Sequence, residues 1–213
     1  MALVVGCSDT RLPAPAVPAT AGPAPTTATA TTRQVPTASP APRVVEVRYR
    51  VRVRARGVGS FPRVLEATLG DPRGWRRAGF RLVRDDANAP YTVVIAEAAE
   101  VDRLCRPYDT YGKYSCQNGP VVAFNADRWR YATPEWTGDL ATYRRMLVNH
   151  EMGHLLGLHH PPAPQCPRPG APALVMAQQS TELGGCLPNP WPLPEEVARA
   201  ARHDLPLAPP YVP

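Results

Sequence analysis

The sequence has almost no lysine, few histidines and no long apolar run. Of its 24 basic residues, all but Lys113 are arginines, and four of the five histidines lie within residues 147–160. No run approaches the roughly 18 apolar residues that a membrane-spanning helix needs, so we expect no such helix. The net charge of +6 is not accompanied by a zinc knuckle, helix-turn-helix spacing or aromatic RNA-binding stripe, so we expect no nucleic-acid partner.

The cysteines form no C-x-x-C pair, which argues against a zinc site built from thiolates. There are five cysteines, so one is left over if the other four pair. The most economical pairing joins Cys105 to Cys116 and Cys166 to Cys186, although four cysteines permit three connectivities. Disulfides are typical of exported proteins, and we therefore expect an extracellular or cell-surface location.

The N-terminal part lacks the aromatic residues of a folded core, since the first aromatic residue of the chain is Tyr49. Residues 8–42 are mainly Pro, Ala and Thr, which cannot bury enough apolar surface to offset the entropy of ordering. We therefore expect a disordered tether at 8–42. Residues 1–7, "MALVVGC", resemble the end of a bacterial lipoprotein signal with Cys7 as the acylated residue.

That match is incomplete, because the basic segment and most of the apolar segment of such a signal are missing. Either the true start lies upstream and the signal is truncated, or the match is chance. The first interpretation predicts that the protein contacts the membrane only through a lipid anchor on Cys7.

Residues 43–213 have the pattern of a single α+β domain, close to α/β in its element order, built on one twisted mixed sheet. Alternating apolar and charged residues predict a half-buried first strand, and the row Arg48, Arg50, Arg52 and Arg54 faces away from the core. This row is a solvated face, a cover for a sheet edge, or a contact for an anionic cell envelope. The expected elements are strands at 44–54, 80–84 and 91–98, a hairpin at 113–125 turning at 117–120, and helices at 61–69 (capped by Ser60), 139–158 (capped by Asp139) and 194–202.

The stretch "LVNHEMGHLLGLHH" points to a metal site. His150 and His154 are four residues apart on the predicted helix, so they lie about 40° apart around its axis and both can reach one ion. Glu151 lies beside them, where a base for an attacking water belongs. Gly157 can end the helix in a left-handed turn that returns His160 as a third ligand. Three protein ligands leave one position open, which is typical of a catalytic zinc site.

His159 adjoins the third ligand, but the spacing from the glycine favours His160. "HEMGHLLGLHH" resembles the H-E-x-x-H-x-x-G-x-x-H signature of the metzincin zinc peptidases. The resemblance implies a Zn²⁺ cofactor, Glu151 as general base, Met176 as the methionine turn beneath the metal, and an irregular, disulfide-closed C-terminal lobe. Gln178 stands where some metzincins carry a tyrosine that helps to hold the metal. The resemblance therefore extends only to those metzincin subfamilies that lack this tyrosine.

A second resemblance covers residues 44–194. The segments "GDLATYRRMLVNHEMGH", "VMAQQ" and "GGCLPNPWP" resemble an uncharacterised, mainly actinobacterial family of secreted or lipid-anchored proteins, known as a domain of unknown function.

The sequence therefore predicts a monomeric zinc metalloendopeptidase that acts on peptide or protein substrates. Gln178, Tyr143 and several arginines are candidates for a second electrophile. The alternative is a non-catalytic, zinc-stabilised module that binds the cell envelope or serves as a scaffold. Glu151 favours the enzyme, because a purely structural zinc does not need an adjacent carboxylate.

Overall fold

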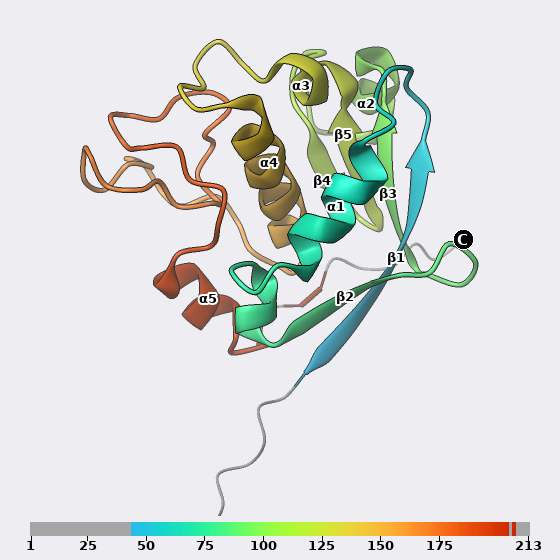
Figure 1. The fold of residues 1–213 in the computed structure, drawn as a ribbon, viewed down its shortest axis with the longest axis horizontal. Helices are drawn as coiled ribbons and strands as arrows, with labels where there is room; N and C mark the ends of the chain where they lie inside the picture. Colours follow the sequence, from blue (N-terminus) through green and yellow to red (C-terminus); the bar gives the residue numbers. More distant parts are fainter. Residues whose placement is uncertain (1–43, 205, 208–213) are drawn as a thin grey trace, which may run out of the picture. The chain divides into compact units, whose positions relative to one another are not determined.

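A computed structural model describes residues 44–204 and 206–207 of the chain, which form a mixed sheet with helices on both of its faces (Figure 1). The predicted lipid-anchor residue Cys7 and the predicted tether at residues 8–42 lie outside the described residues. No helix in the described part is both long and apolar enough to cross a membrane. The α+β class predicted from the sequence is confirmed.

The elements follow one another in the order strand, helices, two strands, helix, two strands, helices. They are β1 (Val45–Val53), α1 (Phe61–Gly70), the 3₁₀ helix η1 (Trp75–Ala78), β2 (Phe80–Arg84), β3 (Tyr91–Ala96), α2 (Ala98–Leu104), β4 (Cys116–Asn118), β5 (Val121–Asn125), α3 (Ala126–Tyr131), α4 (Leu140–Leu155) and α5 (Pro194–Ala200).

The sheet has the strand order β2-β1-β3-β5-β4. The first four strands are parallel to one another, and only β4 runs antiparallel, to β5. Because β1 lies between β2 and β3, its arginine row does not cover an edge. Arg48 and Arg54 form ion pairs with acidic side chains, and Arg50 and Arg52 donate to backbone carbonyl groups. The row is therefore engaged largely within the protein.

The strand β3 is buried on both faces from Val93 to Ala96, which explains why this part of it is continuously apolar rather than alternating. Val93 and Ile95 of β3 belong to the main core, beneath α1 and α4, which lie side by side in Figure 1. Val94 and Ala96 belong to a smaller core on the opposite face, which α2 covers. The long helix α4 is thus held rigidly against the sheet.

Several boundaries differ from those predicted. The strand predicted at 91–98 ends at Ala96, because Ala98 begins α2, a helix that the sequence did not reveal. Neither α3 nor η1 was predicted. Ser60 makes no side-chain capping bond to α1, whereas Asp139 caps α4 as expected by accepting a 2.8 Å hydrogen bond from the Thr142 amide. The hairpin strand predicted at 113–116 is observed as Cys116–Asn118, closer to the turn.

The segment between α4 and α5 is irregular, as predicted. It is held by hydrogen bonds from side chains to backbone carbonyl groups rather than by the regular backbone hydrogen bonds of helices and strands. Gln179 and Asn189 are buried and donate hydrogen bonds of 2.7–3.0 Å to four carbonyl groups of this segment and its flank. Disulfides join Cys166 to Cys186 and, outside this segment, Cys105 to Cys116. Both are the pairs expected from the sequence.

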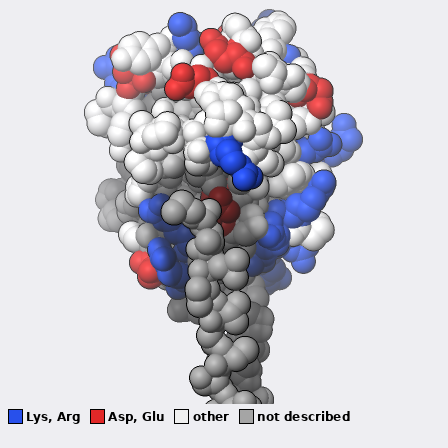
Figure 2. Space-filling view, turned by 90° about the vertical axis from the view of Figure 1, so that its left-hand side faces the viewer, with Lys and Arg blue, Asp and Glu red and all other residues white. Residues whose placement is uncertain are grey.

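This segment presents a face with little charge. Between residues 161 and 192 the charged residues are Arg168 and Glu182. Figure 2 shows this side of the molecule, where most of the blue and red side chains lie around the margin of a mainly white surface.

Candidate metal centre

Helix α4 ends at Leu155, three residues earlier than predicted. The end of the helix determines the positions of two candidate ligands, His154 in its last turn and His160 in the loop that follows. Gly157 has φ 87°, a left-handed conformation that a side chain would disfavour. The Leu158 amide donates a 3.0 Å hydrogen bond to the Gly153 carbonyl, and the Gly157 amide donates to that of His154. This is the Schellman arrangement, which reverses the chain directly after the helix. Leu158 therefore lies outside the helix but remains bonded to it.

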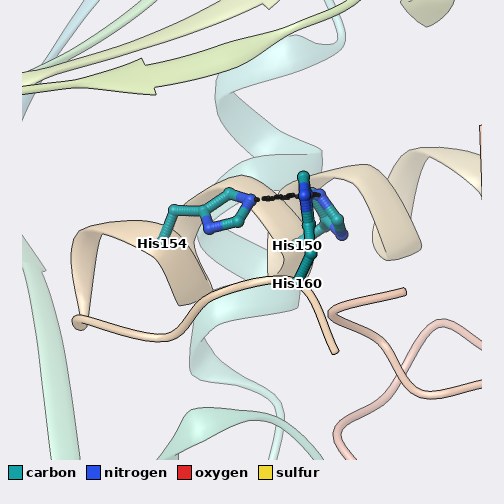
Figure 3. Close-up of side chains that lie close together, drawn as sticks. All are labelled: His150, His154 and His160. Atoms are coloured by element: carbon teal, nitrogen blue, oxygen red, sulfur yellow. Dashed lines mark hydrogen bonds between the residues drawn. The ribbon is translucent and has the colours of Figure 1, made fainter. Parts of the chain in front are cut away.

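The three predicted histidines converge on one point (Figure 3). His150 and His154 extend from α4, and His160 returns from the loop after the Gly157 turn. The three Nε2 atoms are 3.1–3.2 Å from one another. His159 is exposed and is not part of the cluster, so the assignment of His160 rather than His159 agrees with the structure.

The hydrogen bonds of the other ring nitrogens determine the tautomers. Nδ1 of His150 lies 2.8 Å from the Val175 carbonyl oxygen, and Nδ1 of His154 lies 2.9 Å from that of Leu158. A carbonyl only accepts, so both Nδ1 atoms carry the proton and both Nε2 atoms present lone pairs. Lone pairs facing each other at 3.2 Å repel, and a cation between them removes the repulsion.

The separation of the nitrogens fits a metal ion. Nitrogens bound to one tetrahedral ion at about 2.0–2.1 Å lie about 3.3–3.4 Å apart, close to the distances observed here. Burial lowers the pKa of His154 to about 4, and burial also lowers the pKa of His150 and of His160. The rings are therefore neutral at pH 7, the form that binds metals. The histidine group can hold a metal ion.

Glu151 lies next to this cluster without being part of it. Its side chain is buried, and no protein group in the described residues hydrogen bonds to it, but it lines two cavities together with His150 and His160. Burial raises the pKa of Glu151 to about 8, and a cation among the histidines would lower the pKa of the carboxyl again. The carboxyl is thus placed to accept a hydrogen bond from a molecule in the cavity.

Met176, which the resemblance assigned to the methionine turn, is buried and packs against α4 at Gly153. The sequence analysis did not single out Gly153. A Cβ atom there would overlap the Met176 sulfur and lie 2.9 Å from Cζ2 of Trp75. The glycine therefore allows the Met176 turn to approach the helix between the two ligands that the helix provides.

Gly153→Ala is expected to lower the free energy of unfolding by about 1–3 kcal/mol, because the added methyl group overpacks this contact. Thermal denaturation followed by circular dichroism measures the change. Gly70→Ala is the control, since a Cβ there meets nothing within 4 Å and Gly70 is also helical. Equal stability of the two variants would contradict the close approach at Gly153.

Glu196 of α5 is a second residue that the sequence analysis missed. Its carboxylate accepts hydrogen bonds from the amides of Val175 (3.0 Å), Met176 (2.8 Å) and Leu193 (2.8 Å). Burial raises the pKa of Glu196, although these three bonds oppose the rise. Because the Val175 carbonyl in turn accepts from His150, Glu196 holds the peptide that orients a candidate ligand. The S/T-x-x-E form of a capping box is absent here, since Leu193 precedes the helix, so this signal was weak.

The residues considered as a second electrophile differ in whether they line the cavities beside Glu151. Tyr143 is buried, and its hydroxyl lies 2.9 Å from Ser180 Oγ, so it does not line the cavities beside Glu151. Gln178 does line both cavities, and its side chain accepts a 3.0 Å hydrogen bond from Gln165. Tyr114, which precedes β4, also lines both, and no sequence pattern marked it.

Comparisons with known proteins identify the family but not an activity. A search of curated proteins finds no match. The model of a family described as "Protein of unknown function (DUF3152)" matches residues 21–186, which include the histidine cluster, Glu151 and Met176. Since the match covers more than half of the chain, the protein belongs to the DUF3152 family.

Proposed function

We propose that the protein is an exported zinc metallopeptidase of the metzincin type, with His150, His154 and His160 as zinc ligands and Glu151 as general base. The observation that carries the proposal is the convergence of the Nε2 atoms at 3.1–3.2 Å beside a buried carboxyl that opens to a cavity. Three neutral imidazoles suit Zn²⁺, and a three-ligand site keeps a position free for the reaction.

Different residues of the chain have different roles in the proposed hydrolysis. When bound, Zn²⁺ polarises a peptide carbonyl group and makes a water molecule more acidic. Glu151 accepts a proton from the attacking water while the oxygen of that water bonds to the carbonyl carbon of the substrate. The carboxyl then gives this proton to the leaving amine while the C–N bond breaks. Val175 and Leu158 keep the histidine rings in the required tautomer through their carbonyl groups.

A cleft beside the histidines supports a peptide as substrate. It has a volume of about 350 Å³ and is lined by Cys116 and Gln117 of β4 as well as by Glu151 and the three histidines. β4 is the last strand of the sheet, and no other strand of the described residues pairs with its outer side. An extended peptide can add to such an edge by backbone hydrogen bonds, which would bring it alongside Glu151.

Two disulfides support export, because they persist in oxidising compartments. A lipid anchor at Cys7, a monomeric state and contact with an anionic envelope remain part of the proposal.

Removal of the metal is expected to abolish peptide hydrolysis. The full chain, loaded with zinc and checked for one equivalent by atomic spectroscopy, is incubated with a diverse peptide library, and the cleavage products are identified by mass spectrometry. Treatment with a chelator should stop cleavage, and added Zn²⁺ should restore it, because the cation supplies the charge that activates water and carbonyl. Stoichiometric zinc without any cleavage would instead support the scaffold function.

A further inference from the structure

A small cavity, here called the inner pocket, extends from the histidine cluster into the protein. It has a volume of about 70 Å³ and is lined by Met146 and Leu147 of α4, by Tyr114, by Arg128 of α3 and by the segment Gln178–Thr181, in addition to Glu151 and two of the histidines. Since one water molecule needs about 10–15 Å³ of such a cavity, the pocket has room for about five water-sized groups. This is the size of a small side chain.

The lining residues that the inner pocket shares with two neighbouring cavities indicate which of its ends is nearer to the histidines. The substrate cleft shares with it His150, Glu151 and His160 but not Arg128. A third cavity, of about 260 Å³, shares with it Tyr114, Arg128 and Ser180 but neither the histidines nor Glu151. Arg128 therefore lies at the end of the inner pocket that is remote from the metal site.

Arg128 forms no ion pair with the described residues, although Glu135 lines the neighbouring cavity together with it. The Arg128 side chain is half-buried, and its Nε atom is enclosed without a hydrogen-bond acceptor. Its neighbour on the same helix, Arg130, by contrast pairs with both Glu97 and Asp127. A buried N–H group without an acceptor is costly to a folded protein, which is why such groups are normally paired.

The lining matches a carboxylate on a short apolar stem. Met146 and Leu147 provide apolar walls, and Arg128 and the Ser180 hydroxyl provide hydrogen-bond donors at the remote end. The Ser180 Oγ atom lies 2.9 Å from the Tyr143 hydroxyl, so Tyr143 can donate to Ser180 while the Ser180 hydroxyl donates into the pocket. The guanidinium group can bind a carboxylate through two parallel hydrogen bonds.

We propose that the inner pocket binds a carboxylate group of the residue next to the scissile bond, with Arg128 as the residue that determines this specificity. The inference rests on the proposed peptidase function. The carboxylate belongs either to a Glu or Asp side chain or to the free end of a peptide chain.

The test compares peptides that carry Glu, Gln or Leu at each of the two positions that flank the cleaved bond, each made with a free and an amidated C-terminus. For the zinc-loaded protein, kcat/KM should be about 10- to 100-fold higher for Glu than for Gln, because a hydrogen bond to a charged group is lost with Gln. Preference for the free over the amidated end would assign the carboxylate to the chain terminus. Arg128→Gln should bring either ratio close to one.

Arg130→Gln removes the same charge from the same helix and should keep the preference of the unmodified protein. Arg128→Gln should also keep Tm, because the Arg128 side chain makes no ion pair or hydrogen bond with the described residues; a fall in Tm would show a structural role and count against the proposal. Equal kcat/KM for Glu, Gln and Leu peptides, with both kinds of C-terminus, would overturn the proposal.

A binding measurement separates this proposal from the peptidase function. Calorimetric titration of the zinc-loaded Glu151→Gln protein with the Glu and Gln peptides, with and without Arg128→Gln, does not depend on turnover. Tighter binding of the Glu peptide that disappears with Arg128→Gln would support the pocket even if no peptide is cleaved, a result that would reject only the peptidase. Equal binding of the two peptides, whether or not they are cleaved, would reject the pocket.

Discussion

Glu151→Gln is expected to lower kcat for peptide hydrolysis by about 10²–10⁴-fold, the typical contribution of general acid–base catalysis. Glutamine has nearly the same shape as glutamate but cannot take up the proton of the attacking water. The side chain makes no hydrogen bond to any described protein group, so its replacement leaves the surrounding packing intact. The histidine ligands remain, and we expect an unchanged equivalent of zinc.

The measurement pairs initial rates on a library-derived peptide with atomic spectroscopy of the same preparations. Glu182→Gln serves as the matched control, because Glu182 is an exposed carboxylate of the C-terminal lobe that does not line the substrate cleft. Undiminished turnover in Glu151→Gln at full zinc occupancy would show that another group is the base. Loss of zinc together with turnover would show that Glu151 holds the metal.

Glu196→Ala is expected to lower the free energy of unfolding by about 3–5 kcal/mol. Each hydrogen bond to a charged group contributes about 1.5–3 kcal/mol, and the carboxylate accepts three of them; the cost of burying the charge offsets part of the sum. The variant also leaves the amides of Val175 and Met176 without acceptors. In a domain of this size such a change corresponds to a fall in Tm of about 10 °C.

Thermal denaturation of the metal-loaded and the metal-free protein checks this expectation. Because Glu196 supports the peptide whose carbonyl orients His150, the variant should also bind zinc more weakly in a competition titration with a chromophoric chelator. Glu195→Ala, at the neighbouring exposed position of α5, should change neither quantity. A shift of Tm without any change in zinc affinity would confine Glu196 to a structural role.

Much of the metal centre was predictable because its determinants are local. The spacing of His150 and His154 follows from helical periodicity, and the return of His160 follows from the conformational freedom of one residue, Gly157. The period-two pattern of β1 likewise indicated a strand with one buried face. Short helices such as α2 and α3 were missed, since so few residues carry little periodic signal.

The sequence by itself therefore determined the candidate ligands, the neighbouring carboxyl and the α+β class, because each is encoded by the spacing of residues along the chain. Only the tertiary structure decided what surrounds them. It brought Glu196 to the amide of Met176, 20 residues away, and Arg128 to the inner pocket beside Ser180, a residue far from it in the sequence. Packing sets these contacts between remote segments, and no local period in the sequence records them.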